Sequence, residues 1–570
     1  MAPYRYKTLR NGEIRLLDLS AGETSSQLSC KIVHASIDDP PLFEALSYTW
    51  GSPGDPHTIL CDDEDICVTD NLKSALLRLR GPVLQRKLWI DQICINQNDV
   101  QERNEQVTLM GDIYRKAQQV LIWLGEGDED SRLGLNYVQI LLTELQPMFD
   151  NGVSEIRFSD LIKALGMPAI KSRAWDALGR IFERAWFRRL WVVQEAALAA
   201  VATMMCGGQT VPWKDMVNVC RCQVGSHDPE HEAHSSMLAI ETQRERHYRG
   251  LDSPVIDILL LCSDFNCTDP RDKIFGLLGL TTDARDPILA PDYSLSVQEV
   301  YGKVTRFLMT RDKSLAVLCD VRNPKTLQGL PTWTPDWSIP SAIQKTLGSR
   351  LRGQYNAAQS TQASVQLSDD LRTLFLDGVA VDSIHTLGNV LLPLPGHDLE
   401  ILPQWESMVQ SAQPYPTGED PTTVLWRTLI ADSGIRGVKS DKHHRDLYDS
   451  WHNIFDRNLL VLHKSKAEWT QLLDHDTLNT RAVEFHTAMS EVCVGRRFLI
   501  TRQGYVGLGP AHARENDMIC IFHGGSVPFL VRQNDTISEY DLVGECFIHG
   551  LMSGEALAKD NLELRRFALR

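Results

Sequence analysis

Several features that would place a protein outside the ordinary soluble class are missing from this 570-residue chain. A membrane-spanning helix needs about eighteen or more apolar residues in a row. The longest candidate, residues 255–262, is far too short and contains Asp257. Residues 1–15 are polar and carry four basic side chains without an apolar core, so they do not resemble a signal peptide. We therefore expect a soluble, cytoplasmic protein that does not enter a membrane.

The chain also lacks an excess of positive charge. Its 58 Lys and Arg residues face 74 Asp and Glu residues, which gives a formal net charge of −16. Binding to nucleic-acid phosphates needs a basic face, so no nucleic-acid partner is expected. The 13 cysteines are spread thinly and lack the paired Cys-x-x-Cys spacing of zinc sites. We expect reduced thiols and no bound metal.

Three common enzyme motifs are absent as well. No Gly-x-Gly-x-x-Gly follows a predicted strand, which disfavours NAD binding of the dehydrogenase type. No phosphate-binding Gly-x-x-x-x-Gly-Lys-Ser/Thr loop and no Gly-x-Ser-x-Gly elbow occurs. The sequence therefore predicts neither a nucleoside triphosphatase nor a serine hydrolase of these types, and no resident cofactor.

What is present is an alternation of short apolar strands and helical patterns in the first third of the chain. This alternation predicts an α/β fold with a parallel sheet and right-handed crossovers. Ligands of such sheets bind at the carboxyl ends of the strands, here Ser47 to Gly51 and Asp91 to Gln97. The expected strands are 43–49, 87–91, 119–124 and 201–206, and the expected helices include 99–117, 137–145 and 175–187.

The remainder divides by composition into further regions. We expect an α/β domain at 28–208, a mainly helical region at 209–350, linker and helical segments at 351–489, and a strand-rich region at 490–570. Regular glycines suggest that the last region is a small barrel or sheet, with turns at 503–504, 507–510 and 524–525. The aromatic segment Pro331 to Trp337 is expected to seal one domain against another.

The string Arg188 to Glu195 contains the most suggestive side chains. Trp191 and Glu195 are four residues apart in what we interpret as an amphipathic helix, so both lie on one face together with Arg188. An aromatic ring, a guanidinium and a carboxylate on one face could bind a sugar nucleotide. The alternative is a surface Glu195 that pairs with Arg188 over a buried Trp191.

Three blocks of the chain resemble the fungal heterokaryon-incompatibility (HET) domain in order and spacing. The first is Phe43 to Gly51, the second runs from Leu88 to Gln97 with Glu102 and Arg103, and the third is Arg184 to Glu195. The resemblance implies a role in fungal non-self recognition and programmed cell death, with a protein partner from an incompatible allele.

HET domains are distantly similar to Toll/interleukin-1-receptor (TIR) domains, which have a flavodoxin-like fold. Several TIR domains cleave NAD with a helical glutamate in a Trp-x-x-x-Glu context and need self-association. The similarity implies that Glu195 is the catalytic carboxylate and that Trp191 packs or stacks beside it. NAD or a related nucleotide would then be a substrate and not a cofactor.

The chemistry of such a cleavage can be matched to further residues. Breaking the nicotinamide–ribose bond passes through an oxocarbenium-like transition state, which one carboxylate can stabilise. Ser47, Tyr48 and Trp50 would line the ribose–phosphate path, and Arg188 and Arg189 would meet the pyrophosphate. The alternative for at least one of these arginines is a surface ion pair with Glu183 or Glu195. Asp91 would bond a ribose hydroxyl or hold its own loop.

Three functions stay open at this point. The first is an NAD glycohydrolase that promotes cell death, and the second is a non-enzymatic HET module that recruits partners, in which Glu195 belongs to a structural ion pair. The third is a hydrolase of another nucleotide that uses the same cleft.

Overall fold

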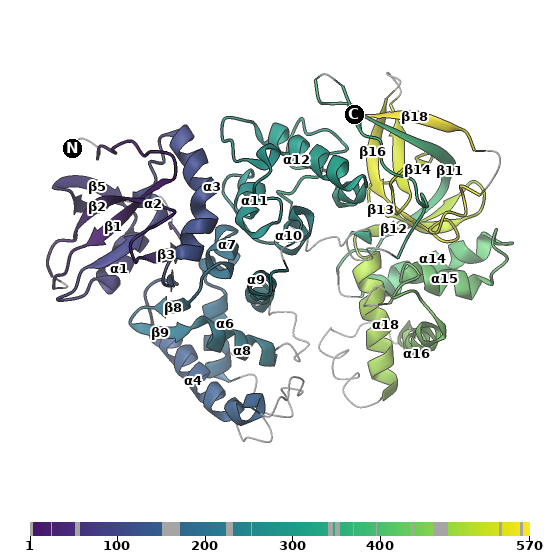
Figure 1. Cartoon of the computed structure of the whole chain (residues 1–570). Helices are drawn as coiled ribbons and strands as arrows, with labels where there is room; N and C mark the ends of the chain where they lie inside the picture. The colour runs from purple at the N-terminus through teal and green to yellow at the C-terminus, as the bar shows by residue number, and fades with distance from the viewer. Residues whose placement is uncertain are drawn as a thin grey trace. The chain divides into compact units, whose positions relative to one another are not determined.

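The computed structural model forms two compact units, Met1–Leu295 and Ser296–Arg570, each of which is described by itself (Figure 1). Each unit has its own large β-sheet. The structure describes residues 4–23, 25–51, 57–150, 172–223, 232–251, 253–339, 346–347, 354–368, 370–394, 396–434, 438–459, 477–534, 539–558 and 562–570.

The sheet of the N-terminal unit has the strand order β5-β4-β2-β1-β6-β3-β7-β8-β9. Its centre is formed by β6, β3, β7 and β8, which run parallel to one another. These are the four strands expected from the apolar runs, and the mixed α/β architecture is confirmed. Across the sheet these parallel strands stand in the order 2-1-3-4, where each number is the position of the strand along the chain. Their bounds are β3 (Glu44–Tyr48), β6 (Arg86–Trp89), β7 (Val120–Trp123) and β8 (Ala202–Cys206).

Five further strands make the sheet mixed and not purely parallel. The strand β1 pairs antiparallel with both β2 and β6, and β9 pairs antiparallel with β8. The strand β1 is not evident from the sequence, because Arg15 and Asp18 interrupt its apolar residues. The five strands are β1 (Glu13–Leu19), β2 (Ser29–Ser36), β4 (His57–Cys61), β5 (Glu64–Val68) and β9 (Gln209–Pro212).

Arg15 is buried within the unit because it forms a two-pronged ion pair with Glu102. Its Nη1 and Nη2 atoms lie 2.6 and 2.9 Å from the two carboxylate oxygens. Glu102 also accepts from the backbone N–H of Asn96 at 2.7 Å, and Arg15 donates to the carbonyl of Cys94 at 3.0 Å. The ion pair therefore fixes the loop that follows β6. Asp99 caps the next helix, but Glu102 binds Arg15 and does not complete a capping box.

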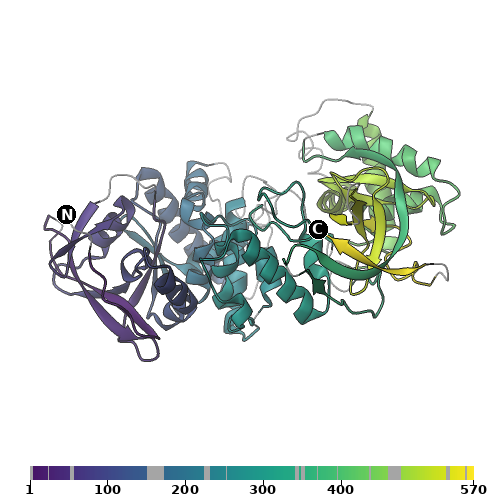
Figure 2. The ribbon, with the colours of Figure 1, turned by 90° about the horizontal axis from the view of Figure 1, so that it is seen from above.

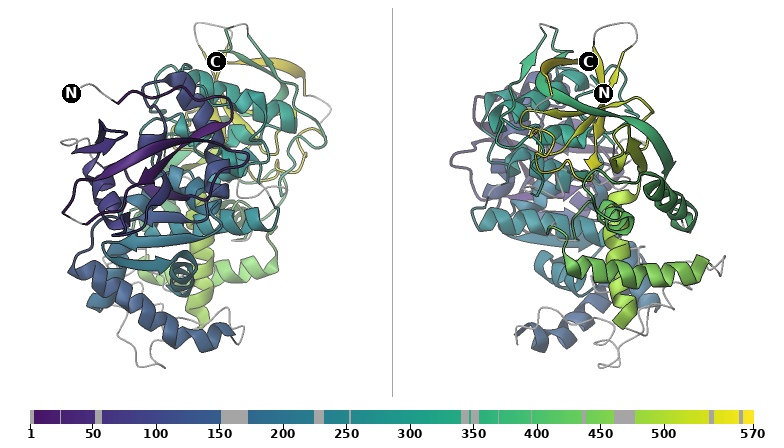
Figure 3. Two further views of the ribbon diagram at one scale, coloured as in Figure 1. Left: turned by 60° about the vertical axis from the view of Figure 1, so that its left-hand side comes forward. Right: turned by 90° about the vertical axis from the view of Figure 1, so that its right-hand side faces the viewer.

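Helices pack against this sheet, and further helices follow its last strand, β9, along the chain. The left panel of Figure 3 shows the N-terminal strands with helices packed around them. The helix α3 contacts α7, and α7 contacts both β3 and β7. None of the described helices is long and apolar enough to cross a membrane. Their bounds are α1 (Asp70–Leu79), α2 (Asp91–Cys94), α3 (Val100–Lys116), α4 (Glu129–Asp150), α6 (Arg173–Phe182), α7 (Trp191–Ala197), α8 (Trp213–Gln223), α9 (Glu232–Tyr248), α10 (Val255–Leu261) and α11 (Asp272–Phe275), with short 3-10 helices η1 (Ala185–Arg188), η2 (Leu278–Leu280) and η3 (Pro287–Leu289).

The C-terminal unit contains a closed ring of five strands. In order around the ring, β11 pairs with β14, β14 with β15, β15 with β16, β16 with β18, and β18 with β11. This barrel confirms that the chain ends in a strand-rich region. The five strands are β11 (Leu374–Val390), β14 (Met518–Phe522), β15 (Phe529–Gln533), β16 (Tyr540–Glu545) and β18 (Leu564–Leu569).

The strand β11 is long enough to serve two sheets. Its first half closes the barrel, and its second half pairs with β12, as the curved ribbon in Figure 2 shows. These residues were expected to belong to the linker and helical segments, because prolines and polar residues surround them. The second sheet continues through β12 (Arg496–Thr501), β13 (Val506–Pro510) and β17 (Phe547–Ile548), and β10 (Gln366–Leu367) pairs with the start of β11.

Residues 507–510, expected to be a turn, form the strand β13. A Cβ at Gly507 would collide with the carbonyl oxygen of Phe547 on β17, so this glycine allows close approach of two strands. The helices of the unit are α12 (Val297–Asp312), α14 (His397–Ser411), α15 (Pro421–Leu429), α16 (Lys442–Leu459) and α18 (Thr477–Cys493), with the 3-10 helix η4 (Ala316–Asp320).

The buried ion pair in the N-terminal unit provides a stability test. Glu102→Ala leaves the Arg15 guanidinium buried without its carboxylate, and we expect a loss of about 3–5 kcal/mol in the free energy of unfolding. Urea-induced unfolding measures this loss. Glu105→Ala, on the exposed face of the same helix, is the control and should change stability by less than about 0.5 kcal/mol. Equal effects of the two substitutions would contradict the assigned role.

Candidate functional site

A hydrogen-bonded pair of side chains lies at the carboxyl end of β3. Ser47 donates its hydroxyl to Glu195 on α7 and accepts from the indole Nε1 of Trp186 at 2.8 Å. Ser47 is fully buried and Glu195 is only 2% exposed. Two of the predicted site residues, 148 positions apart in the chain, are thus in direct contact.

Burial raises the pKa of Glu195 from its ordinary range to about 7. The positive charge of Arg189 and the hydrogen bond from Ser47 lower the pKa, and the negative charge of Asp91 raises it, but these effects are smaller than that of burial. Among the residues that the structure describes, Glu195 forms no ion pair. The expected pairing of Glu195 with Arg188 at the surface is therefore wrong. A carboxyl group of this kind is typical of functional sites.

The second group of predicted residues meets around Asp91, at the carboxyl end of the neighbouring strand β6. The indole Nε1 of Trp50 donates to Asp91 Oδ2 at 2.7 Å, and the backbone N–H of Gln92 donates to Oδ1 at 2.7 Å. The hydroxyl of Tyr48 donates to the side-chain oxygen of Gln92 at 3.2 Å. Burial also raises the pKa of Asp91. Tyr48, Trp50 and Asp91 thus form one cluster, and the backbone bond shows that Asp91 holds its own loop.

Arg188 and Arg189 were both candidates for phosphate binding, and the guanidinium beside these two acids belongs to Arg189. Arg189 donates to the backbone carbonyl of Tyr48, and its charge lowers the pKa of both Glu195 and Asp91. Arg188 is exposed and lies at the end of the 3-10 helix η1, outside α7. The helical periodicity that placed Arg188 on one face with Glu195 does not apply, because Arg189 and Leu190 separate the two helices.

Trp191 contacts a different partner from that of Glu195. Its Nε1 donates to Asp272 at 3.1 Å, and Asp272 also accepts from the hydroxyl of Tyr293 at 2.6 Å. Burial raises the pKa of Asp272 to about 6. Residues 192–197 of α7 are all buried, so α7 is not the amphipathic helix that was expected. Trp191 therefore packs against the helical part of the unit.

Gln194 makes a second link between α7 and this helical part. Its side-chain oxygen accepts from the backbone N–H of Gly279 at 2.8 Å. A Cβ at Gly279 would lie 2.5 Å from the same oxygen and 3.1 Å from the Cα of Gly111 on α3. The sequence did not reveal Gln194, Trp186 or Asp272 as residues of this site. Trp186 and Arg189 lie within the third block, but that block does not reveal which side chain each contacts.

Comparison with known proteins finds one family match in the N-terminal part of the chain and a second in the C-terminal part. Residues 43–195 match the family model of the heterokaryon incompatibility protein (HET), and residues 414–569 match that of the Het-6 beta-barrel domain. Heterokaryon incompatibility protein 6, OR allele, of Neurospora crassa is 26% identical over 647 aligned residues, which cover 95% of this chain and 94% of that protein. The chain is a HET-domain protein. No solved structure matches it.

The HET match begins beside β3 and ends at Glu195, so it contains both members of the Ser47–Glu195 pair. The Het-6 barrel match contains four of the five ring strands and the helices α15, α16 and α18. The first ring strand, β11, precedes that match. The structural units therefore extend beyond the segments that the family models cover.

The raised pKa of Glu195 predicts a specific dependence of stability on pH. Between about pH 4.5 and 7, the folded protein holds a proton that the unfolded chain has released. Protonated Glu195 therefore favours the folded state at low pH, and the free energy of unfolding falls as the pH rises through this interval. Glu195→Gln removes the ionisation, so the variant should exceed the wild type in free energy of unfolding at pH 8 by on the order of 2–3 kcal/mol and match it near pH 4.

The measurement is the free energy of unfolding of both proteins across this pH range. Glu183→Gln, which replaces an exposed carboxylate just after α6, is the control and should follow the wild-type curve. If the Glu195→Gln curve runs parallel to the wild-type curve, Glu195 has no raised pKa.

Proposed function

We propose that this chain acts in fungal non-self recognition and that its N-terminal unit promotes cell death by cleaving NAD or a related nucleotide at Glu195. The similarity to a Neurospora protein named for heterokaryon incompatibility supports the first part. The observation that carries the second part is the buried Glu195 carboxyl at the carboxyl edge of a parallel sheet, with a pKa near 7 and no ion-pair partner among the described residues.

The strand order supports a TIR-like, flavodoxin-like origin of the N-terminal sheet. Its parallel strands follow the order 2-1-3-4, which is also the order of the first four strands in flavodoxin-like folds. In such folds the ligand binds outside the carboxyl ends of the strands, where the order reverses. Here the reversal is at β3, whose end carries Ser47, Tyr48 and Trp50.

The arrangement of the acids suits the cleavage of an N-glycosidic bond. In the proposed reaction, water attacks C1′ of the ribose, and the bond to nicotinamide breaks with its electron pair leaving on the nitrogen. One proton is released. The ionised form of Glu195 would stabilise the positive charge on the ribose. Asp91 would hold a ribose hydroxyl, and Arg189, with the exposed Arg188, would bind the pyrophosphate.

The burial of Glu195 requires that the site open before a nucleotide can reach it. We propose that self-association, triggered by a protein from an incompatible allele, produces this opening. Trp191 and Gln194 link α7 to the helical part of the unit through Asp272 and Gly279, so movement of that part would shift the helix that carries Glu195. This is a gating step of the kind that lids and loops perform in other enzymes.

A second candidate is a non-enzymatic module that recruits partners. The 2% exposure of Glu195 and the complete burial of Ser47 favour it, because a closed site needs no substrate. In that case the Ser47–Glu195 hydrogen bond would serve only to fix α7 on the sheet. A hydrolase for another nucleotide is distinguished from NAD cleavage by the choice of substrate in the assay.

NAD turnover by concentrated, assembled protein tests the proposal. The wild type should consume NAD, and Glu195→Gln should lose at least about 100-fold in rate, because it removes the charge that stabilises the transition state. Glu183→Gln should retain wild-type turnover. Mass spectrometry of a nucleotide panel shows whether another nucleotide is cleaved instead.

Expression in fungal cells provides the complementary readout. Toxicity should depend on Glu195 and should accompany the loss of cellular NAD. Toxicity of the wild type without loss of any nucleotide, and toxicity retained in Glu195→Gln, would reject the enzymatic proposal in favour of the recruiting module.

A further inference from the structure

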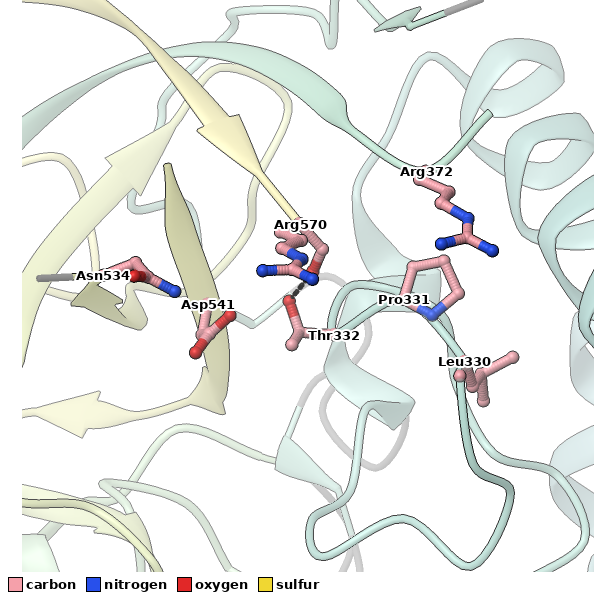
Figure 4. A pocket seen from close by; sticks show the side chains of 8 residues that line it. Leu330, Pro331, Thr332, Arg372, Asn534, Asp541 and Arg570 are labelled. Atoms are coloured by element: carbon pink, nitrogen blue, oxygen red, sulfur yellow. Dashed lines mark hydrogen bonds between the residues drawn. The ribbon is translucent and has the colours of Figure 1, made fainter. Parts of the chain in front are cut away.

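A pocket of about 260 Å³ lies at one mouth of the C-terminal barrel (Figure 4). The lining residues lie just before β11, just after β15, at the start of β16, just after β18 and in the segment before Trp333. They are Gly329, Leu330, Pro331, Thr332, Arg372, Asn534, Asp541 and Arg570. The mouths of β-barrels are frequent sites for small ligands, and this volume suits a molecule smaller than a typical drug.

The segment that closes this pocket is fixed to the barrel by hydrogen bonds. The backbone N–H of Thr332 donates to the carbonyl of Arg570 at 2.7 Å, and its hydroxyl accepts from the N–H of Leu542 at 3.0 Å. The indole Nε1 of the fully buried Trp333 donates to the carbonyl of Arg372 at 2.9 Å. These bonds join the segment to three barrel strands. The pocket is therefore formed in advance, which reduces the ordering cost of binding.

Half-buried Lys325 and buried Asp336 form further hydrogen bonds that hold the same segment. The Lys325 ammonium donates to the carbonyls of Pro331 and Thr334, and Asp336 accepts from the N–H groups of Thr326 and Leu327. Pro331 to Trp337 was expected to seal one domain against another. The contacts described here lie within the C-terminal unit, where the ring of Trp337 packs against Tyr301 on α12.

The charged groups of the pocket are unevenly distributed. In the view of Figure 4, Asp541 and Asn534 lie on one side of Arg570, and Pro331 and Leu330 lie on the other, with Arg372 above them. Within the described part of the chain, neither guanidinium forms an ion pair. The lining thus carries two guanidinium groups and one side-chain carboxylate, that of Asp541. Together they match a ligand that has an anionic group for the arginines and hydrogen-bond donors for the carboxylate.

We propose that the barrel mouth binds a small organic anion of amino-acid or monosaccharide size. Arg372 and Arg570 bind its phosphate or carboxylate group, and its hydroxyl or ammonium groups donate to Asp541 and Asn534. Leu330 and Pro331 cover the apolar part of the ligand. The proposal is independent of the chemistry at Glu195, because every residue of the pocket belongs to the C-terminal unit.

Isothermal titration and thermal unfolding of the full-length protein test this site. The probes are inorganic phosphate, glycerol 3-phosphate, glucose 6-phosphate and glutamate, each at up to millimolar concentration. At least one organic anion should bind and raise the melting temperature, because a ligand that binds only the folded state stabilises it. A preference for the phosphates or for glutamate identifies the anionic group.

The variants decide whether binding occurs in this pocket. Arg372→Gln and Arg570→Gln should each weaken binding at least about tenfold, because each removes a charged hydrogen-bond donor. Asp541→Asn should weaken binding of the organic anions and spare inorganic phosphate. Arg481→Gln, an exposed arginine on α18, is the matched control and should bind as the wild type does. The absence of binding by all organic probes, or an equal loss in Arg481→Gln, would overturn the proposal.

Discussion

The helix α7 is joined to the sheet by a hydrogen bond that its own buried carboxyl group accepts. This carboxyl group has no cation partner in the described structure. Glu195 accepts this bond from Ser47, which in turn accepts from Trp186. Burying a carboxyl group without a counter-ion costs stability, and the raised pKa of Glu195 reports that cost. A residue selected only to fix the helix could be a neutral glutamine. The presence of a carboxyl group in spite of this cost is therefore an argument for the proposed chemistry at this position.

The contacts of α7 also explain why the first structural unit continues to Leu295, far beyond the HET match. Trp191 bonds to Asp272 and Gln194 bonds to Gly279, so the helix is bound to the sheet on one side and to the segment 269–295 on the other. Without that segment, the buried faces of α7 and α3 would be exposed to water. The HET segment and the helices that follow it consequently belong to one compact unit, whereas the sequence had suggested a boundary at residue 208.

The sequence predicted the features that depend on local pattern and missed those that depend on distant partners. The four parallel strands were predictable because each is a short, nearly continuous apolar run. The strand β1 was not, because its Arg15 is acceptable in a buried strand only when Glu102 pairs with it. Similarly, Gly507 is typical of a turn until the close approach of β17 is known. The acids Glu195 and Asp91 were predictable as residue types, but the choice between Arg188 and Arg189 depended on a 3-10 segment that the helical pattern did not reveal.

Burial of Glu195 controls whether its carboxyl group is ionised, and the proposed activity needs the ionised form. In the closed site, the carboxyl group holds its proton up to about pH 7, and a protonated acid cannot stabilise a positive ribose. Water that enters during opening would reduce the cost of the charge and return the pKa toward its ordinary value. The movement that admits a nucleotide would therefore also produce the charged form of Glu195. A closed protein would be inactive for two reasons, the lack of access and the lack of charge, and both would end in the same step.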